Sequence, residues 1–158
     1  MKFNKSIKNL LIVLFATFAL SACSTAKKSG STSGDVYTGK ETVKYLAKGV
    51  ADRVFFATNK STLTTASRAT LRKQADYLRK NKNLKVVIEG HADERGTREY
   101  NLALGEKRAN AAKDYLMTYG ISGKRISVIS YGKEKPVNSA STTLAWSQNR
   151  RSVTVKVK

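Results

Sequence analysis

The sequence predicts an α+β domain in which helices cover mainly one face of a mixed, four-stranded sheet. Short apolar runs and longer segments of helical periodicity follow one another in the order strand, helix, strand, helix, strand. Right-handed crossovers then pack the helices on the sheet. At the carboxyl end, Val153, Val155 and Val157 alternate with Thr154 and Lys156. This alternation predicts a last strand whose polar side faces water.

The first half of the domain predicts one strand between two helices. We expect a short helix near 41–48 and a strand near 53–56. A longer helix is expected over 64–80, because Leu71 and Leu78 fall on one face of it.

A second strand and the longest helix follow. Residues 85–89 form a short apolar run that stops at Gly90, as a buried strand does before a tight loop. After the loop, Thr97 is a suitable N-cap, and apolar residues recur at helical offsets until Gly120, a typical helix stop. Gly105, inside this helix, predicts close backbone contact or close approach of a ligand, of which we favour backbone contact.

The last part of the chain predicts two further strands, at 126–130 and 153–157. A loop and a short helical turn around 144–148 connect them. We expect Trp146, in this turn, to lie in or near the core.

Groups of both charges gather where the strand at 85–89 meets the long helix. Asp93 lies near the amino end of the helix, where exposed N–H groups favour an anion. Asn101, Leu104 and Arg108 are three and four residues apart, so they share one helix face. A carboxylate binds an ammonium, and an arginine binds a carboxylate through two parallel bonds. The ligand expected here therefore carries both charges.

The segment GHADERG, followed by YNLALGEKRA, resembles the OmpA-like peptidoglycan-binding domain. ISVISYGKEKP at 126–136 and NRRSV at 149–153 also resemble this family, and the likeness covers roughly 50–157. It implies the OmpA-like fold and non-covalent binding of diaminopimelate in peptidoglycan stem peptides. The side chain of diaminopimelate ends in an ammonium and a carboxylate. The resemblance implies neither a cofactor nor catalysis.

The same resemblance assigns binding residues. It places the acidic ligand position at Asp93 and the ligand-binding arginine at Arg108. Three further residues are expected to line the pocket: Arg95, Asn101 and Leu104. In the loop after the first strand, Asn59 stands where relatives often have an aspartate or an aromatic residue. It can accept a hydrogen bond there but brings no charge.

The amino end predicts an exported lipoprotein. Three lysines precede an apolar run at 10–20, which is too short to span a bilayer, and the sequence LSAC then forms a lipobox. We expect 1–22 to be a cleaved signal peptide and Cys23, the single cysteine, to be the lipidated residue. By resemblance to bacterial lipoproteins, Ser24 indicates the outer membrane.

Residues 23–40 are mostly Ser, Thr, Gly and Lys, which predicts a flexible tether. We expect 41–158 to form a single domain that faces the periplasm. The tether gives this domain reach from the membrane toward the wall.

Positive charge dominates the chain. The net charge is +19, and removal of the three lysines of the signal peptide leaves +16. Such a surface attracts anionic polymers, of which nucleic acid is the first to consider. The cations are spread over helices, loops and tether without a recognition motif, and export removes the domain from cytoplasmic nucleic acid. We therefore expect anionic wall polymers and lipid head groups, and no nucleic acid, as partners of this surface.

Catalytic and metal-binding functions find little support. His91 is the only histidine and Cys23 is assigned to lipid, which argues against a transition-metal site. A triad of His91, Asp93 and a serine lacks a GxSxG nucleophile, so an enzyme that cuts wall peptides is not expected. We expect His91 to form hydrogen bonds within its loop.

Several charged residues are compatible with a purely structural role. Asp93 and Glu94 can act as helix-end charges alone, and Arg108 can form an internal pair with either of them. For Asn149–Arg151 we favour a structural role over contact with the wall or a partner.

Protein partners are a second class of function for this chain. The resemblance implies an interaction protein of the Tol system, which binds the propeller protein TolB or other outer-membrane proteins. The sequence does not map that surface.

Overall fold

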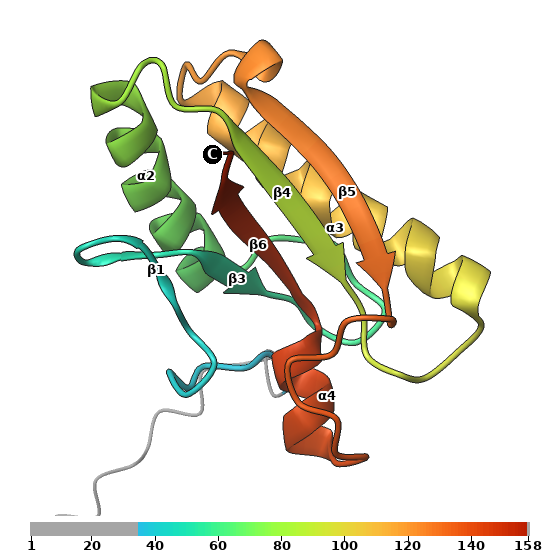
Figure 1. Ribbon diagram of the computed structural model, residues 1–158. Helices are drawn as coiled ribbons and strands as arrows, with labels where there is room; N and C mark the ends of the chain where they lie inside the picture. The colour runs from blue at the N-terminus through green and yellow to red at the C-terminus, as the bar shows by residue number, and fades with distance from the viewer. Residues whose placement is uncertain (1–34, 158) are drawn as a thin grey trace, which may run out of the picture. The chain divides into compact units, whose positions relative to one another are not determined.

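A computed structural model describes residues 35–157 (Figure 1). The expected signal peptide, Cys23 and the tether up to residue 34 lie outside the described residues. In chain order the elements are β1 (Tyr45–Ala47), β2 (Val50–Ala51), β3 (Arg53–Phe55), α2 (Thr65–Lys80), β4 (Val86–His91), α3 (Arg98–Thr118), a 3₁₀ turn (Gly123–Arg125), β5 (Ile126–Gly132), α4 (Thr143–Asn149) and β6 (Arg151–Lys156).

The main sheet has the strand order β3-β6-β4-β5. β6 is antiparallel to both β3 and β4, whereas β4 and β5 are parallel and are connected through α3. The helices α2 and α3 lie behind the sheet in Figure 1, and α4 lies at one end of it. The predicted mixed sheet of four strands, with helices mainly on one face, is confirmed.

The core lies between the sheet and the two long helices. Its buried members come from β3, α2, β4, α3 and β5 and from the segments next to them: Val54, Phe56, Leu71, Ala75, Leu78, Val86, Ile88, Ala109, Ala112, Leu116, Ile121 and Ile126. Burial of these side chains supplies the main driving force for the fold. No helix among residues 35–157 has the length and apolar character needed to cross a membrane.

Both long helices begin as the sequence predicts. The hydroxyl of Thr64 accepts a hydrogen bond from the Ser67 N–H at 3.1 Å, and that of Thr97 accepts one from the Tyr100 N–H at 3.2 Å. Each bond satisfies an N–H that has no partner within its own helix. Gly120 adopts a φ of +80° after α3, as expected of a residue that ends a helix.

The prediction of a helix near 41–48 is wrong. In its place β1 and β2 form an antiparallel hairpin, in which Tyr45 pairs with Ala51. Gly49 reverses the chain with a φ of +74°, a conformation that glycine adopts without steric cost. Val43 and Tyr45 favour extended backbone, and Leu46 is the one side chain of β1 that is buried.

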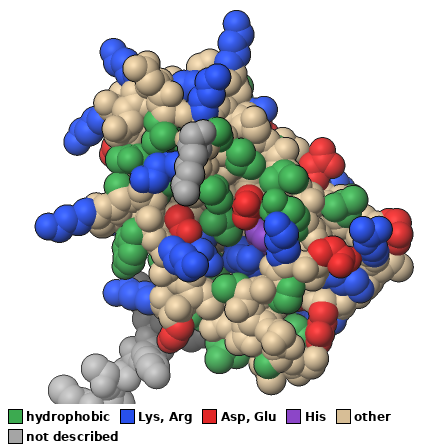
Figure 2. All heavy atoms as spheres, in the orientation of Figure 1, with side chains coloured by type: hydrophobic (Ala, Val, Ile, Leu, Met, Phe, Trp, Pro, Cys, Tyr) green, Lys and Arg blue, Asp and Glu red, His purple; other side chains and the backbone are tan. Residues whose placement is uncertain are grey.

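The face assignment of the last strand is also wrong. Thr154 is buried and faces α2, where its hydroxyl donates to Oε1 of Gln74 at 2.8 Å. Gln74 is itself fully buried, so the two polar groups satisfy each other inside the protein. Val155, by contrast, lies 39% exposed on the open face of the sheet. Figure 2 shows this face, where hydrophobic side chains lie among protruding lysines and arginines.

Two glycines position α3 on the sheet. A Cβ atom on Gly90 would overlap the backbone oxygen of Gly105, and a Cβ on Gly105 would press against Gly90 and Ser130. The close backbone contact predicted for Gly105 is therefore confirmed. It brings the first turns of α3 against the end of β4, where Asp93 follows.

Candidate functional site

The candidate site lies where three loops meet at one end of the sheet. Phe55 of β3 pairs with Arg151 of β6, and the Phe56 N–H donates to the Arg150 carbonyl at 2.9 Å. The segments after β3 and before β6 therefore lie side by side. The loop between β4 and α3, which contains Asp93, completes the site.

Asp93 is a buried carboxylate that is held by two arginines. Arg95 donates from Nε to Oδ1 at 3.0 Å and from Nη2 to Oδ2 at 2.7 Å, and Arg150 donates from Nη1 to Oδ2 at 3.3 Å. Burial alone would raise the pKa of Asp93, but the bonds from Arg95 and Arg150 outweigh it and lower the pKa below its usual value. The carboxylate is therefore ionised at neutral pH.

Arg95 is the exposed partner of Asp93. Its side chain is 42% exposed, and its guanidinium stacks 4.3 Å from the centre of the Trp146 ring. The indole N–H of Trp146 donates to Oε1 of Glu94 at 2.8 Å. Trp146, expected in or near the core, is thus half-buried and belongs to the wall of the site. Because Arg95 is exposed, a ligand cation can replace its guanidinium at Asp93 at a lower cost in free energy than it can replace the buried Arg150.

Arg150 connects the parts of the site, which agrees with the structural role expected for Asn149–Arg151; its contact with two carboxylates was not predicted. Its side chain is 2% exposed and donates from Nε to the Phe56 carbonyl at 3.1 Å. Its Nη2 donates to the backbone oxygen of Asp35 and lies 3.6 Å from Oδ2 of that residue. With its bond to Asp93, one buried guanidinium therefore spans two carboxylates.

Asp35 is the second carboxylate of the site and lies in the segment expected to be tether. The backbone N–H of Thr58 donates to its Oδ2 at 2.6 Å. Burial tends to raise the pKa of Asp35, but the hydrogen bonds from Thr58 and the charge of Arg150 lower it overall. Nothing in the sequence marks this residue, because it is a single acid in a stretch of small polar residues.

Arg108 lies beneath the loops with no exposed surface. It donates to three backbone carbonyls: to Lys60 at 2.9 Å, to His91 at 2.8 Å and to Ala57 at 3.1 Å. Within residues 35–157 its hydrogen bonds go to these carbonyls and not to Asp93 or Glu94, and its guanidinium lies 5.4 Å from the centre of the Phe56 ring. Burial and the charge of Arg150 lower the pKa of Arg108 to about 10, so it stays charged at neutral pH.

The other predicted site residues lie around this centre. Asn101 is buried and donates from Nδ2 to the Arg95 carbonyl at 2.8 Å, which ties α3 to the loop of Asp93. Leu104 is buried one turn further along α3. Asn59 is exposed and has a φ of 55°, a left-handed conformation that asparagine tolerates better than most residues. Its side-chain role in binding stays a prediction.

His91 does not form the hydrogen bonds that we expected within its loop. It ends β4 with 1% exposure, and neither ring nitrogen has a hydrogen-bond partner within residues 35–157. The ring packs 5.6 Å from that of Tyr131, and Nε2 lies 3.6 Å from Oε2 of Glu89. Burial, and then the charges of Arg151, Arg53 and Lys135, lower the pKa of His91 to about 3.

This buried histidine predicts a loss of stability in weak acid. Below pH 6.5 the unfolded chain protonates His91, whereas the folded protein does not do so until about pH 3. The free energy of unfolding should therefore fall from pH 6.5 downward, by up to about 1.4 kcal/mol per pH unit. Urea denaturation at pH 7, 6 and 5 measures this slope. Because the chain has one histidine, His91→Leu should flatten it, and an unchanged slope would refute the assignment.

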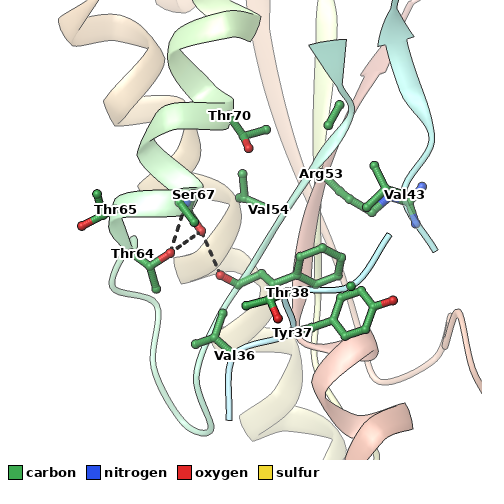
Figure 3. Close-up of a pocket in the computed structure, with 14 residues that line it drawn as sticks. Val36, Tyr37, Thr38, Val43, Arg53, Val54, Thr64, Thr65, Ser67 and Thr70 are labelled. Atoms are coloured by element: carbon green, nitrogen blue, oxygen red, sulfur yellow. Dashed lines mark hydrogen bonds between the residues drawn. The ribbon is translucent and has the colours of Figure 1, made fainter. Parts of the chain in front are cut away.

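A cavity of about 410 Å³ lies near the site, between the segment 36–43, β3 and the start of α2 (Figure 3). Figure 3 shows Thr64 and Ser67 joined by hydrogen bonds at its edge. The one charged residue in its lining is Arg53, which is paired with Asp52 at 2.8 Å. The cavity therefore does not match a ligand of both charges, whereas the site around Asp93 does.

Comparison with known proteins agrees with the likeness seen in the sequence. The OmpA family matches residues 55–150. A peptidoglycan-associated lipoprotein of Rhizobium meliloti is 45% identical over 153 residues, which cover 92% of this chain and 86% of the relative. The chain belongs to the peptidoglycan-associated lipoproteins of the OmpA family. The member from Haemophilus influenzae is 38% identical and is covered to 97% of its length, with 95% of this chain.

Solved structures agree with the fold. The crystal structure of the peptidoglycan-associated lipoprotein from Burkholderia pseudomallei has a TM-score of 0.65 and 38% identity, and the match covers 67% of this chain and 90% of that one. The C-terminal domain of Helicobacter pylori MotB, at 18% identity and a TM-score of 0.63, shows the fold alone; that match covers 68% of this chain and 84% of that one. None of these relatives is named for a catalytic activity.

Proposed function

We propose that this lipoprotein binds peptidoglycan without a covalent bond, through the diaminopimelate residue of the stem peptide. Membership of the family supports binding to peptidoglycan. One observation in the site supports diaminopimelate as the residue that is bound. The carboxylate of Asp93 lies beside a carboxylate-binding position formed by Arg150 and the Thr58 N–H. These groups match an ammonium and a carboxylate on one carbon.

The free protein supplies its own charges to both positions. The guanidinium of Arg95 binds the carboxylate of Asp93, as a ligand ammonium would. The carboxylate of Asp35 accepts the hydrogen bond of the Thr58 N–H, as a ligand carboxylate would. We propose that the ligand ammonium replaces Arg95, which then contacts the stem peptide from the rim. In the same proposal Asn101 and Leu104 shape the helix side of the pocket.

Arg108 takes a different role in this proposal from direct capture of the ligand. By holding the carbonyls of Ala57 and Lys60 it fixes the loop that carries Thr58 and Asn59. Its buried positive charge also favours a ligand carboxylate nearby. Asn59, at the exposed turn of this loop, is proposed to accept a hydrogen bond from the stem peptide.

The proposed attachment follows from the amino end. Cleavage after residue 22 and lipidation of Cys23 would anchor the chain in the outer membrane, and the following segment would bridge to the periplasmic domain. The lipoprotein would then tether the outer membrane to the wall as part of the Tol–Pal system, with TolB as a partner. In this role it would support envelope integrity and cell division.

Co-sedimentation of the full chain with purified sacculi tests the proposal. Free diaminopimelate should release the protein, whereas cadaverine, which keeps the two ammonium groups but has no carboxylate, should not release it at the same concentration. Raised salt weakens contacts of the exposed cations and thus measures binding of anionic wall polymers by the basic surface. Release by salt but not by diaminopimelate would contradict the pocket and favour that surface. Soluble wall fragments in the supernatant would instead reveal an enzyme.

A further inference from the structure

The carboxylate-binding part of the proposed site is filled by the protein itself. Oδ2 of Asp35 accepts the Thr58 N–H at 2.6 Å, and Nη2 of Arg150 contacts both the side chain and the backbone oxygen of Asp35. Arg150 is 2% exposed and Asp35 is 39% exposed. The buried guanidinium of Arg150 and the Thr58 N–H thus both bind the carboxylate of Asp35, which lies on a more exposed segment.

The segment that carries Asp35 is fixed by its own contacts. Tyr37 is 7% exposed, and its ring packs edge-on against Phe55 with 4.8 Å between the ring centres. Its hydroxyl accepts a hydrogen bond from the Glu41 N–H at 3.2 Å. In Figure 3 Val36, Tyr37 and Thr38 lie along one side of the cavity next to β3. We name residues 35–39 the strap.

We infer that the strap is an internal competitor, in which Asp35 closes the carboxylate position until a wall ligand displaces it. This inference rests on the proposed function. The Thr58 N–H provides one hydrogen, and Asp35 already accepts it, so a ligand carboxylate and Asp35 cannot both bind it well. Displacement has to break the bonds of Arg150 to Asp35 as well.

The strap lowers the apparent affinity of the site and ties binding to the length of the tether. The observed Kd equals the intrinsic Kd divided by the open fraction, so a strap closed nine-tenths of the time weakens binding about tenfold. Because the strap lies between Cys23 and the rest of the domain, its release lets up to about five further residues extend. That corresponds to at most roughly 18 Å of additional reach.

Asp35→Ala in the full chain tests the competition. Calorimetric titration with a soluble stem peptide ending in diaminopimelate should give a Kd about three to ten times lower than that of the unaltered chain. Glu41→Gln is the matched control, because it removes an exposed carboxylate six residues away, whose side chain is not placed in the site. Its Kd should equal that of the unaltered chain.

Hydrogen exchange of the Thr58 amide supplies a readout that needs no ligand. Exchange should be faster in Asp35→Ala than in Glu41→Gln, because the amide has lost its acceptor. Equal exchange in both variants, or an equal or higher Kd in Asp35→Ala than in the unaltered chain, overturns the competition. If the unaltered chain, Asp35→Ala and Glu41→Gln all fail to bind the stem peptide, the proposed function is refuted, and the competition is refuted with it.

Discussion

Asp93→Ala should abolish co-sedimentation of the full chain with sacculi. The substitution removes the carboxylate that we propose to bind the ligand ammonium, and it leaves the buried guanidinium of Arg150 without one of its partners. Charge-assisted hydrogen bonds contribute about 1.5–3 kcal/mol each, so the loss of two corresponds to roughly a hundredfold or more in Kd. Titration with the stem peptide measures this change directly.

Asp114→Ala is the matched control for this experiment. Asp114 lies exposed on α3, the helix that follows the loop of Asp93, so the variant has the same change of net charge without touching the site. It should pellet like the unaltered chain. Asp93→Ala must first show a cooperative unfolding transition. Undiminished pelleting by a folded Asp93→Ala chain would refute the assignment of the ammonium position.

Arg108→Ala should lower both stability and binding. Loss of the guanidinium leaves three backbone carbonyls without their donor and opens a cavity under the loops. We expect the free energy of unfolding to fall by about 3–5 kcal/mol in urea denaturation. Pelleting with sacculi should be lost as well, because the loop that carries Thr58 loses its support.

The neighbouring Lys107 provides the control for Arg108. It is exposed on α3, so Lys107→Ala should change stability by less than about 0.5 kcal/mol. Arg108→Lys keeps the charge but cannot serve three carbonyls in one plane, and it should recover only part of the stability. An Arg108→Ala chain as stable as the unaltered one that still fails to bind would contradict the supporting role and indicate direct ligand contact.

The parts of the fold that local chemistry decides are the parts the sequence predicts well. Thr97 caps α3 as predicted, and Gly105 lies in the predicted close backbone contact, with Gly90 of β4. The hairpin in place of the expected helix and the reversed faces of β6 depend on tertiary contacts. The Thr154 hydroxyl is buried because Gln74, eighty residues earlier, receives it.

The same distinction holds for the site. Asp93, Arg95 and Asn101 lie within one strand-to-helix junction, so helical spacing and loop position bring them together in advance of any structure. Arg150 contacts Asp93 and Asp35, which lie 57 and 115 positions away in the sequence. No periodic pattern predicts contacts between residues so far apart in the sequence. The block NRRSV does contain Arg150, and its likeness to the family is the one signal in the sequence that points to this residue.

The position of β6 in the sheet makes the last residues of the chain decisive for assembly. β6 lies between β3 and β4, so without it the first strand of the main sheet has no neighbour to pair with. In a chain without β6, no strand connects β3 to β4, so the loop after β3 is not held beside the loop of Asp93. Recognition of the ligand should therefore be absent from chains truncated before β6.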